Sequence, residues 1–184
     1  MDGEDTRLLT ELARLVQPHI RRGRFELTDG QSTDWYVDGR SFMLSPEGSA
    51  LVGRRMADLL ADEVRSIGGP VTASIPVVAA VVHQSPVPRR GFYVRAEPRA
   101  HGLLRQIEGN LESVVAIVDD TCATGGSIIR CINAVERAGS VVRQVIVVFD
   151  RDDGGEHIRR MGYDYRYLLR LEDGRPVGST GPLG

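Results

Sequence analysis

Residues 114–127 read VVAIVDDTCATGGS and indicate a strand, a turn and the start of a helix. The apolar, β-branched run from Val114 to Val118 is typical of a strand buried on both faces, as in a parallel sheet covered by helices. Hydrophobic residues then recur at helical spacing, at positions 128, 129, 132 and 135. Because ligands of such sheets bind at the carboxyl ends of strands, we expect a ligand site at this turn.

The turn itself has the composition of an anion-binding loop. Glycine lets the backbone approach a ligand closely, and the N–H groups from Thr124 to Ser127, with the positive end of the helix dipole, suit a phosphate. Asp119 and Asp120 suit sugar hydroxyls or a hydrated Mg²⁺ carried by the ligand. The implied ligand is a sugar phosphate with a metal. The alternative is a βα turn that contains glycines by chance, with solvated acids at the strand end.

This segment resembles the 5-phosphoribosyl 1-diphosphate (PRPP) signature of the type I phosphoribosyltransferases. It is not a Walker loop, because the Gly-Lys-Ser/Thr ending is missing. The resemblance implies that Asp119 and Asp120 hold the ribose hydroxyls and act in catalysis, and that the loop holds the ribose 5-phosphate. The residues of this segment expected to bind PRPP are Asp119, Asp120, Thr121, Cys122, Ala123, Thr124, Gly125, Gly126 and Ser127.

Composition agrees with a compact enzyme. The chain has 184 residues, 41% hydrophobic content and a net charge of −2, which is enough for one substantial core. We expect one domain over residues 1–174, cytoplasmic, with no membrane span, no signal peptide and no nucleic-acid footprint. Cys122 and Cys131 lack metal-ligand spacing, so no structural zinc is expected. All 23 basic residues are arginine.

Hydrophobic spacing and turn residues predict the remaining elements. A first helix carrying Leu8 and Leu12 is ended by Pro18 and Gly23, and a second begins at Ser45-Pro46 and is stopped by residues 68–70. Further helices are expected at 77–82, after the signature up to Gly139, and near 156–161. Strands are expected at 35–38, 71–75, 91–95, 114–118, 141–149 and, last, 165–171. The polar stretch 96–112 is long for a connection and typical of a lid.

Strands that alternate with helices predict an α/β fold with a mainly parallel, twisted sheet flanked by helices. Residues 1–45 do not follow the alternation, and we expect them to form a small N-terminal hood over the strand ends of a core at 46–174. Residues 175–184 are rich in Gly and Pro, which predicts a flexible tail.

Three further segments narrow the resemblance to the orotate phosphoribosyltransferases. Residues 25–38, FELTDGQSTDWYVD, look like that family's N-terminal hood, and residues 95–102, RAEPRAHG, look like its mobile catalytic loop. The pair Asp150-Arg151 matches the family's Asp-Arg at the end of the strand after the signature helix. The resemblance spans about residues 8 to 172 and implies a homodimer, in which the loop reaches the neighbouring subunit's site.

Physical chemistry gives these matches roles. Arg151 offers a planar fork of donors for the orotate carboxylate, against the alternative of an exposed arginine beside two aspartates. Tyr36 and Val37 would pack against a flat pyrimidine ring, and the alternative is that they are ordinary core residues. The resemblance adds Ala123 to the residues expected to bind the acceptor. In the loop, we expect Arg95, Arg99 and His101 to neutralise the charge of the departing diphosphate. The alternative is that these three residues belong to a solvated charged loop.

The chain departs from the family pattern at three lysine positions. Thr28 replaces the hood lysine, Ala73 the lysine of the diphosphate-binding turn, and Ala96 the first loop lysine. Each charge-assisted hydrogen bond contributes about 1.5–3 kcal/mol. Loss of the three lysines should weaken binding of the donor or of the transition state by orders of magnitude, unless an arginine takes their place. The candidates in the sequence are Arg89, Arg90 and Arg105.

Three hypotheses follow. The first is transfer of the phosphoribosyl group from PRPP to orotate with Mg²⁺, giving orotidine 5′-monophosphate and diphosphate. The second is a divergent enzyme of this fold with another acceptor or donor. The third is a catalytically silent sensor of PRPP or a nucleotide that regulates a partner.

Overall fold

The computed structural model describes residues 3–26, 32–97 and 106–179 as an α/β protein. Its elements are α1 (Gly3–Val16), the 3₁₀ helix η1 (Gln17–His19), β1 (Ile20–Glu26), β2 (Ser32–Val37), α2 (Gly39–Met43), α3 (Pro46–Leu59), β3 (Ser66–Pro70), α4 (Ser74–Gln84), β4 (Arg90–Val94), β5 (Ile107–Gly109), β6 (Val114–Cys122), α5 (Gly126–Arg137), β7 (Val141–Arg151), α6 (Glu156–Arg160), β8 (Asp164–Glu172) and β9 (Arg175–Gly178). Among the described residues, no helix has the length and apolar content needed to cross a membrane.

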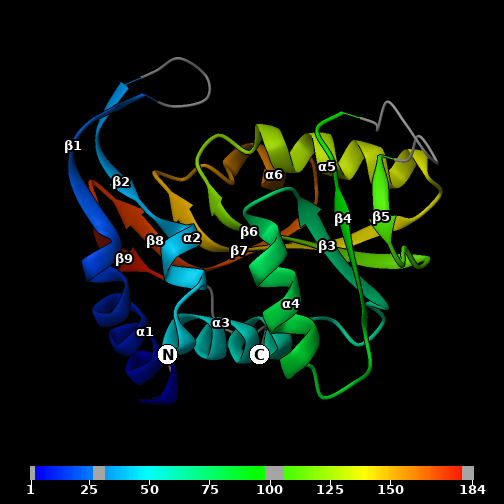
Figure 1. Cartoon of the computed structure of the whole chain (residues 1–184), viewed down its shortest axis with the longest axis horizontal. Helices are drawn as coiled ribbons and strands as arrows, with labels where there is room; N and C mark the ends of the chain where they lie inside the picture. The colour runs from blue at the N-terminus through cyan, green and yellow to red at the C-terminus, as the bar shows by residue number, and fades with distance from the viewer. Residues whose placement is uncertain (1–2, 27–31, 98–105, 180–184) are drawn as a thin grey trace.

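A seven-stranded sheet in the order β5-β4-β3-β6-β7-β8-β9 forms the centre of the molecule (Figure 1). Its five inner strands are parallel, and the two edge strands are antiparallel to their neighbours. Helices α5 and α6 cover one face, and α1, α3 and α4 cover the other. Each face buries its own hydrophobic cluster, so the predicted fold class is confirmed.

The strand β6 and helix α5 form as the sequence predicts. Val115 to Val118 are fully buried between the two helical layers, which is why this strand carries apolar residues without alternation. Helix α5 buries Ile128, Ile132 and Val135 against the sheet. It ends before Gly139, whose φ of +90° is a left-handed conformation that glycine adopts readily.

The secondary structure of residues 66–75 differs from the sequence prediction. Gly68, Gly69 and Pro70 do not stop a helix but form β3, and the strand predicted at 71–75 is a turn followed by α4. Gly68 and Gly69 are needed inside the strand because neighbours come very close. A β-carbon on Gly68 would lie 2.4 Å from the Phe92 ring, and one on Gly69 would lie 2.0 Å from the Val118 carbonyl oxygen.

Three more strands, β1, β5 and β9, were not predicted. Gly23 does not end a helix, because α1 stops at Val16 and Gly23 lies inside β1, where the register with β2 shifts. The expected flexible tail is wrong for residues 175–178, which form β9 and pair with β8. The short strand β5 also lies within the expected loop 96–112, and residues 98–105 of that loop lie outside the described part.

The N-terminal segment shares its core with the sheet. Leu12 and Val16 of α1, Trp35 of β2 and Phe42 of α2 belong to the same buried cluster as Leu169 of β8. The ribbon of β1 and β2 stands beside β8 and β9 at the left of Figure 1, next to the end of β7. This placement brings the predicted hood to the end of the strand that carries Arg151.

Candidate active site

The two adjacent acids lie at the carboxyl end of β6, as the sequence predicts. Asp119 and Asp120 are 4% and 8% exposed, and the Asp120 N–H donates to Asp119 Oδ1 at 3.0 Å. Burial raises the pKa of Asp119 well above its ordinary value, and the negative charge of Asp120 raises it further. Burial also raises the pKa of Asp120, against the opposing effects of the Thr121 backbone N–H and the positive charge of Arg40. The pair therefore favours bound hydroxyls or a cation that compensates its charge.

The glycine-containing turn has the geometry of an anion-binding loop. Gly125 precedes α5 with a φ of +75°, and no side chain caps the helix. The first backbone N–H groups of α5 therefore have no capping side chain, which leaves them for a ligand. Thr124 and Ser127 are exposed, whereas Cys122 is buried. Burial raises the pKa of the Cys122 thiol to about 12, so this cysteine is an unreactive part of the core.

The turn after β7 supports this loop. The Gly154 N–H donates to the Arg151 carbonyl oxygen at 2.9 Å, which turns the chain back toward β6. A β-carbon on Gly154 would lie 2.4 Å from the Ala123 carbonyl oxygen. Asp150, fully buried, accepts from the Gly155 N–H at 3.4 Å and fixes the far side of the turn. The backbone of residues 151–154 thus lies directly against the candidate anion-binding loop, residues 123–127.

A cavity of about 310 Å³ joins the predicted acceptor residues to the end of β6. Its lining includes Asp120 and Thr121 from β6 and the turn residues Thr72 and Ala73 after β3. All four residues predicted to bind the acceptor also line it, namely Tyr36, Val37, Ala123 and Arg151. Donor and acceptor candidates thus face one space.

Arg151 is not the exposed arginine of the alternative interpretation. It is 6% exposed, and its guanidinium carbon lies 4.4 Å from the centre of the Trp35 ring. Its Nη2 donates to Thr33 Oγ1 at 2.5 Å. Its buried Nε has no hydrogen-bond partner among the described residues but lies 3.3 Å from Asp152 Oδ2 in an ion pair. Stacking and the Thr33 bond fix the plane of the guanidinium, as recognition of a planar carboxylate requires.

Arg40 of α2 is a lining residue that the sequence analysis missed. Its Nη2 donates to the Tyr36 hydroxyl at 3.3 Å, and its charge acts on Asp120. Gly39 allows this contact of α2 with β6, since a β-carbon there would lie 2.6 Å from Asp120 Oδ2. The only sequence signal for Arg40 is its position just after the hood-like segment 25–38.

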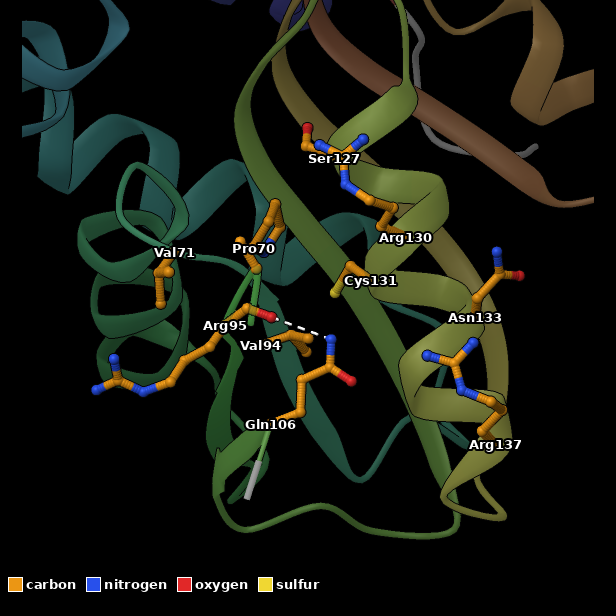
Figure 2. A pocket seen from close by; sticks show the side chains of 11 residues that line it. Pro70, Val71, Val94, Arg95, Gln106, Ser127, Arg130, Cys131, Asn133 and Arg137 are labelled. Carbon is orange, nitrogen blue, oxygen red and sulfur yellow. Dashed lines mark hydrogen bonds between the residues drawn. The ribbon is translucent and has the colours of Figure 1, made fainter. Parts of the chain in front are cut away.

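Other predicted residues lie elsewhere. Arg95 and Ser127 line a second cavity of about 190 Å³ between α5 and β4 (Figure 2). Arg95 Nε donates to Glu108 at 2.6 Å, and its side chain points away from α5. Thr28, Arg99 and His101 lie outside the described residues, while Ala96 also lines the second cavity.

The substitute arginines suggested by the sequence are at the opposite end of the sheet. Arg89 and Arg90 lie where β4 begins, whereas the cavities lie where the strands end. Arg89 is buried and donates to the Val64 carbonyl oxygen at 3.1 Å, and Arg90 pairs with Glu112. These two residues cannot replace the missing lysines, and Arg105 lies outside the described residues.

No protein-family model matches the chain. It is 39% identical over 170 residues to the orotate phosphoribosyltransferase of Mycobacterium avium, covering 90% of this chain and 95% of that protein. It resembles the crystal structure of Mycobacterium tuberculosis orotate phosphoribosyltransferase in complex with PRPP, with a TM-score of 0.74, 33% identity and coverage of 89% and 96%. A phosphoribosyltransferase from Corynebacterium diphtheriae gives a TM-score of 0.77 at 32% identity, with coverage of 91% and 98%.

Proposed function

Since the chain belongs to the orotate phosphoribosyltransferase family, we propose that it transfers the 5-phosphoribosyl group from PRPP to orotate. The products are orotidine 5′-monophosphate and diphosphate. The observation that carries this proposal is the single cavity shared by Asp120 and Thr121 of the PRPP signature and by Arg151, the predicted orotate-binding residue. A site for the donor and a site for a carboxylated acceptor therefore meet at the end of β6.

We assign the donor's ribose hydroxyls to Asp119 and Asp120 and its 5-phosphate to the backbone of residues 123–127. Buried carboxylates without a cation partner favour hydroxyl donors, because hydrogen bonds offset the loss of hydration. The first turn of α5 supplies N–H groups and the positive end of the helix dipole. These contacts orient the anomeric carbon toward the cavity, where the bond to diphosphate breaks and the bond to the orotate nitrogen forms.

We assign the orotate carboxylate to Arg151 and the ring to the surface made by Tyr36, Val37 and Ala123. Trp35 beneath the guanidinium keeps Arg151 in plane, which reduces the entropy lost on binding. Orientation of this kind places the attacking nitrogen before reaction and accelerates displacement.

Magnesium fits this site only as part of the donor complex. Among the described residues, no group of three or more His, Cys, Asp or Glu side chains could hold a metal ion. Mg²⁺ usually keeps several waters and binds through one or two carboxylates and substrate phosphates, which suits the paired Asp119 and Asp120. When bound, it neutralises part of the charge of the diphosphate.

The test is a turnover assay with PRPP, Mg²⁺ and orotate, followed by detection of orotidine 5′-monophosphate. We expect product from the parent protein and at least tenfold lower kcat/KM for orotate in an Arg151→Ala variant. Arg160→Ala is the matched control, because Arg160 is largely exposed on α6 and pairs only with Glu156 in the described part of the chain. Absence of product, with binding of PRPP retained, would reject orotate as the acceptor and support the divergent enzyme or the sensor.

We further propose a homodimer in which the loop 95–102 completes the neighbouring subunit's site. The family resemblance supports this shared site. The cytoplasmic location expected from the sequence also stays a prediction. Mixing an Arg99→Ala chain with an Asp120→Asn chain should regenerate sites with both groups intact, so activity should recover. Subunits that exchange without recovery of activity would contradict a shared site.

A further inference from the structure

The missing lysines leave the donor's phosphates with few cationic partners. Arg89 and Arg90 lie where β4 begins, at the other end of the sheet from the cavities, and Arg151 is assigned to the acceptor carboxylate. A different arginine lies beside the phosphate loop itself. We propose that Arg130 of α5 binds the ribose 5-phosphate of PRPP together with the backbone N–H groups of the loop, an inference that rests on the proposed function.

The geometry of α5 places Arg130 over the start of its own helix. Arg130 lies four residues after Gly126, the first residue of α5. Long side chains in helices point toward the N-terminus, so a residue one turn along the helix covers the first turn. Arg130 Nη1 lies 3.6 Å from the position that a β-carbon would take on Gly126. Figure 2 shows the guanidinium of Arg130 directly beside Ser127.

Arg130 is available for a ligand. It is exposed, and it forms no ion pair or side-chain hydrogen bond with any residue in the described part of the chain. Arg95, which lines the same cavity, is instead bound to Glu108 at 2.6 Å. A phosphate held at the first turn of α5 would thus meet an unpaired guanidinium.

The charge balance also points to an anion. A cation is unfavourable at the N-terminus of a helix, where the dipole is positive. Arg130 adds its charge to this positive end, and the helix has no acidic residue in its first turn to compensate it. A dianionic phosphate would offset both the dipole and the guanidinium. The free protein therefore carries an electrostatic repulsion that the ligand removes.

Arg137 provides a matched control. It lies on the same helix, lines the same cavity and is exposed like Arg130. It lies seven residues further along, about 10 Å from Arg130 along the helix axis. Loss of Arg137 therefore removes the same charge from the protein without removing a group at the loop.

The experiment compares Arg130→Ala, Arg130→Lys and Arg137→Ala in calorimetric titrations with ribose 5-phosphate and with PRPP. We expect Arg130→Ala to weaken ribose 5-phosphate binding at least tenfold and to raise the KM for PRPP with little change in kcat, since this contact exists before and during reaction. Arg130→Lys should recover part of the affinity, and Arg137→Ala should change it less than twofold. The free Arg130→Ala protein should unfold no earlier than the parent.

Three negative results have different meanings. If the parent binds ribose 5-phosphate and Arg130→Ala binds it equally well, the role of Arg130 is rejected while the proposed function stands. If Arg137→Ala loses as much affinity as Arg130→Ala, the effect is one of general charge, and a direct contact is again rejected. If the parent binds neither ribose 5-phosphate nor PRPP, the proposed function fails together with this inference.

Discussion

Replacing Asp120 with asparagine should make the free protein more stable near neutral pH while it removes activity. Asp120 is 8% exposed, and burial raises the pKa of its carboxyl group from 3.8 to about 6. The folded protein therefore binds the proton more tightly than the unfolded chain does. Ionisation of Asp120 opposes folding, and asparagine has nearly the same shape without the charge.

The size of the effect follows from the pKa. Each pKa unit is equivalent to about 1.4 kcal/mol, so the rise makes ionised Asp120 less favourable in the folded state by about 3 kcal/mol. The penalty is complete above about pH 6 and absent below the unfolded value of 3.8. We expect Asp120→Asn to raise the free energy of unfolding by about 3 kcal/mol at pH 8 and by about 1 kcal/mol at pH 4.5.

Urea unfolding of the ligand-free protein at these two pH values measures the difference. Asp58→Asn is the control, because Asp58 is exposed on α3 and a surface change is expected to matter by less than about 0.5 kcal/mol. Asp120→Asn should also lose turnover, since an amide cannot serve as the charged partner of the ribose hydroxyls. Equal stabilisation at both pH values, or none at pH 8, would refute the assignment of a buried, unfavourable charge to Asp120.

Three other substitutions test separate parts of the structure. Gly125→Val should weaken ribose 5-phosphate binding more than tenfold in calorimetry, because the φ of +75° strains a β-branched residue; unchanged affinity would reject the loop. Arg151→Lys should raise the KM for orotate ten- to a hundredfold in initial-rate assays, since lysine cannot form the two-pronged hydrogen bond to the orotate carboxylate and about 1.5–3 kcal/mol of binding free energy is lost; an unchanged KM would place the orotate carboxylate elsewhere. Gly68→Ala should destabilise the protein by about 1–3 kcal/mol in urea, because its β-carbon would lie 2.4 Å from the Phe92 ring; Gly178→Ala, in open space, should have little effect, and equal effects would contradict the packing argument.

The parts predicted well from the sequence are those in which local pattern and tertiary environment agree. The run from Val115 to Val118 is buried on both faces, so its composition reflects its place in the sheet. Gly139 ends α5 because the left-handed conformation required there suits glycine. The cavity brings Tyr36 and Arg151 together although they are far apart in the chain. No local sequence pattern predicts that Tyr36 and Arg151 lie at the same site; only the family resemblance does.

The errors have a common physical cause. Gly68, Gly69 and Pro70 look like a helix stop, but β3 needs small residues because Phe92 and the Val118 carbonyl approach them closely. This requirement comes from neighbouring strands and is invisible in the segment itself. Strand β9 was missed for a similar reason, because pairing with β8 orders a Gly- and Pro-containing segment that has no hydrophobic alternation of its own.

The contact between Gly154 and the Ala123 carbonyl oxygen limits how this protein can be redesigned. Four residues, 151–154, span the distance from the predicted acceptor arginine to the backbone of the proposed phosphate loop, and a β-carbon at Gly154 would already lie 2.4 Å from the Ala123 carbonyl oxygen. An insertion or deletion here would displace the proposed donor site together with the proposed acceptor site. Libraries aimed at new acceptors should therefore keep the length of this turn and vary Tyr36 and Val37, whose strand reaches the cavity from the separate ribbon of β1 and β2.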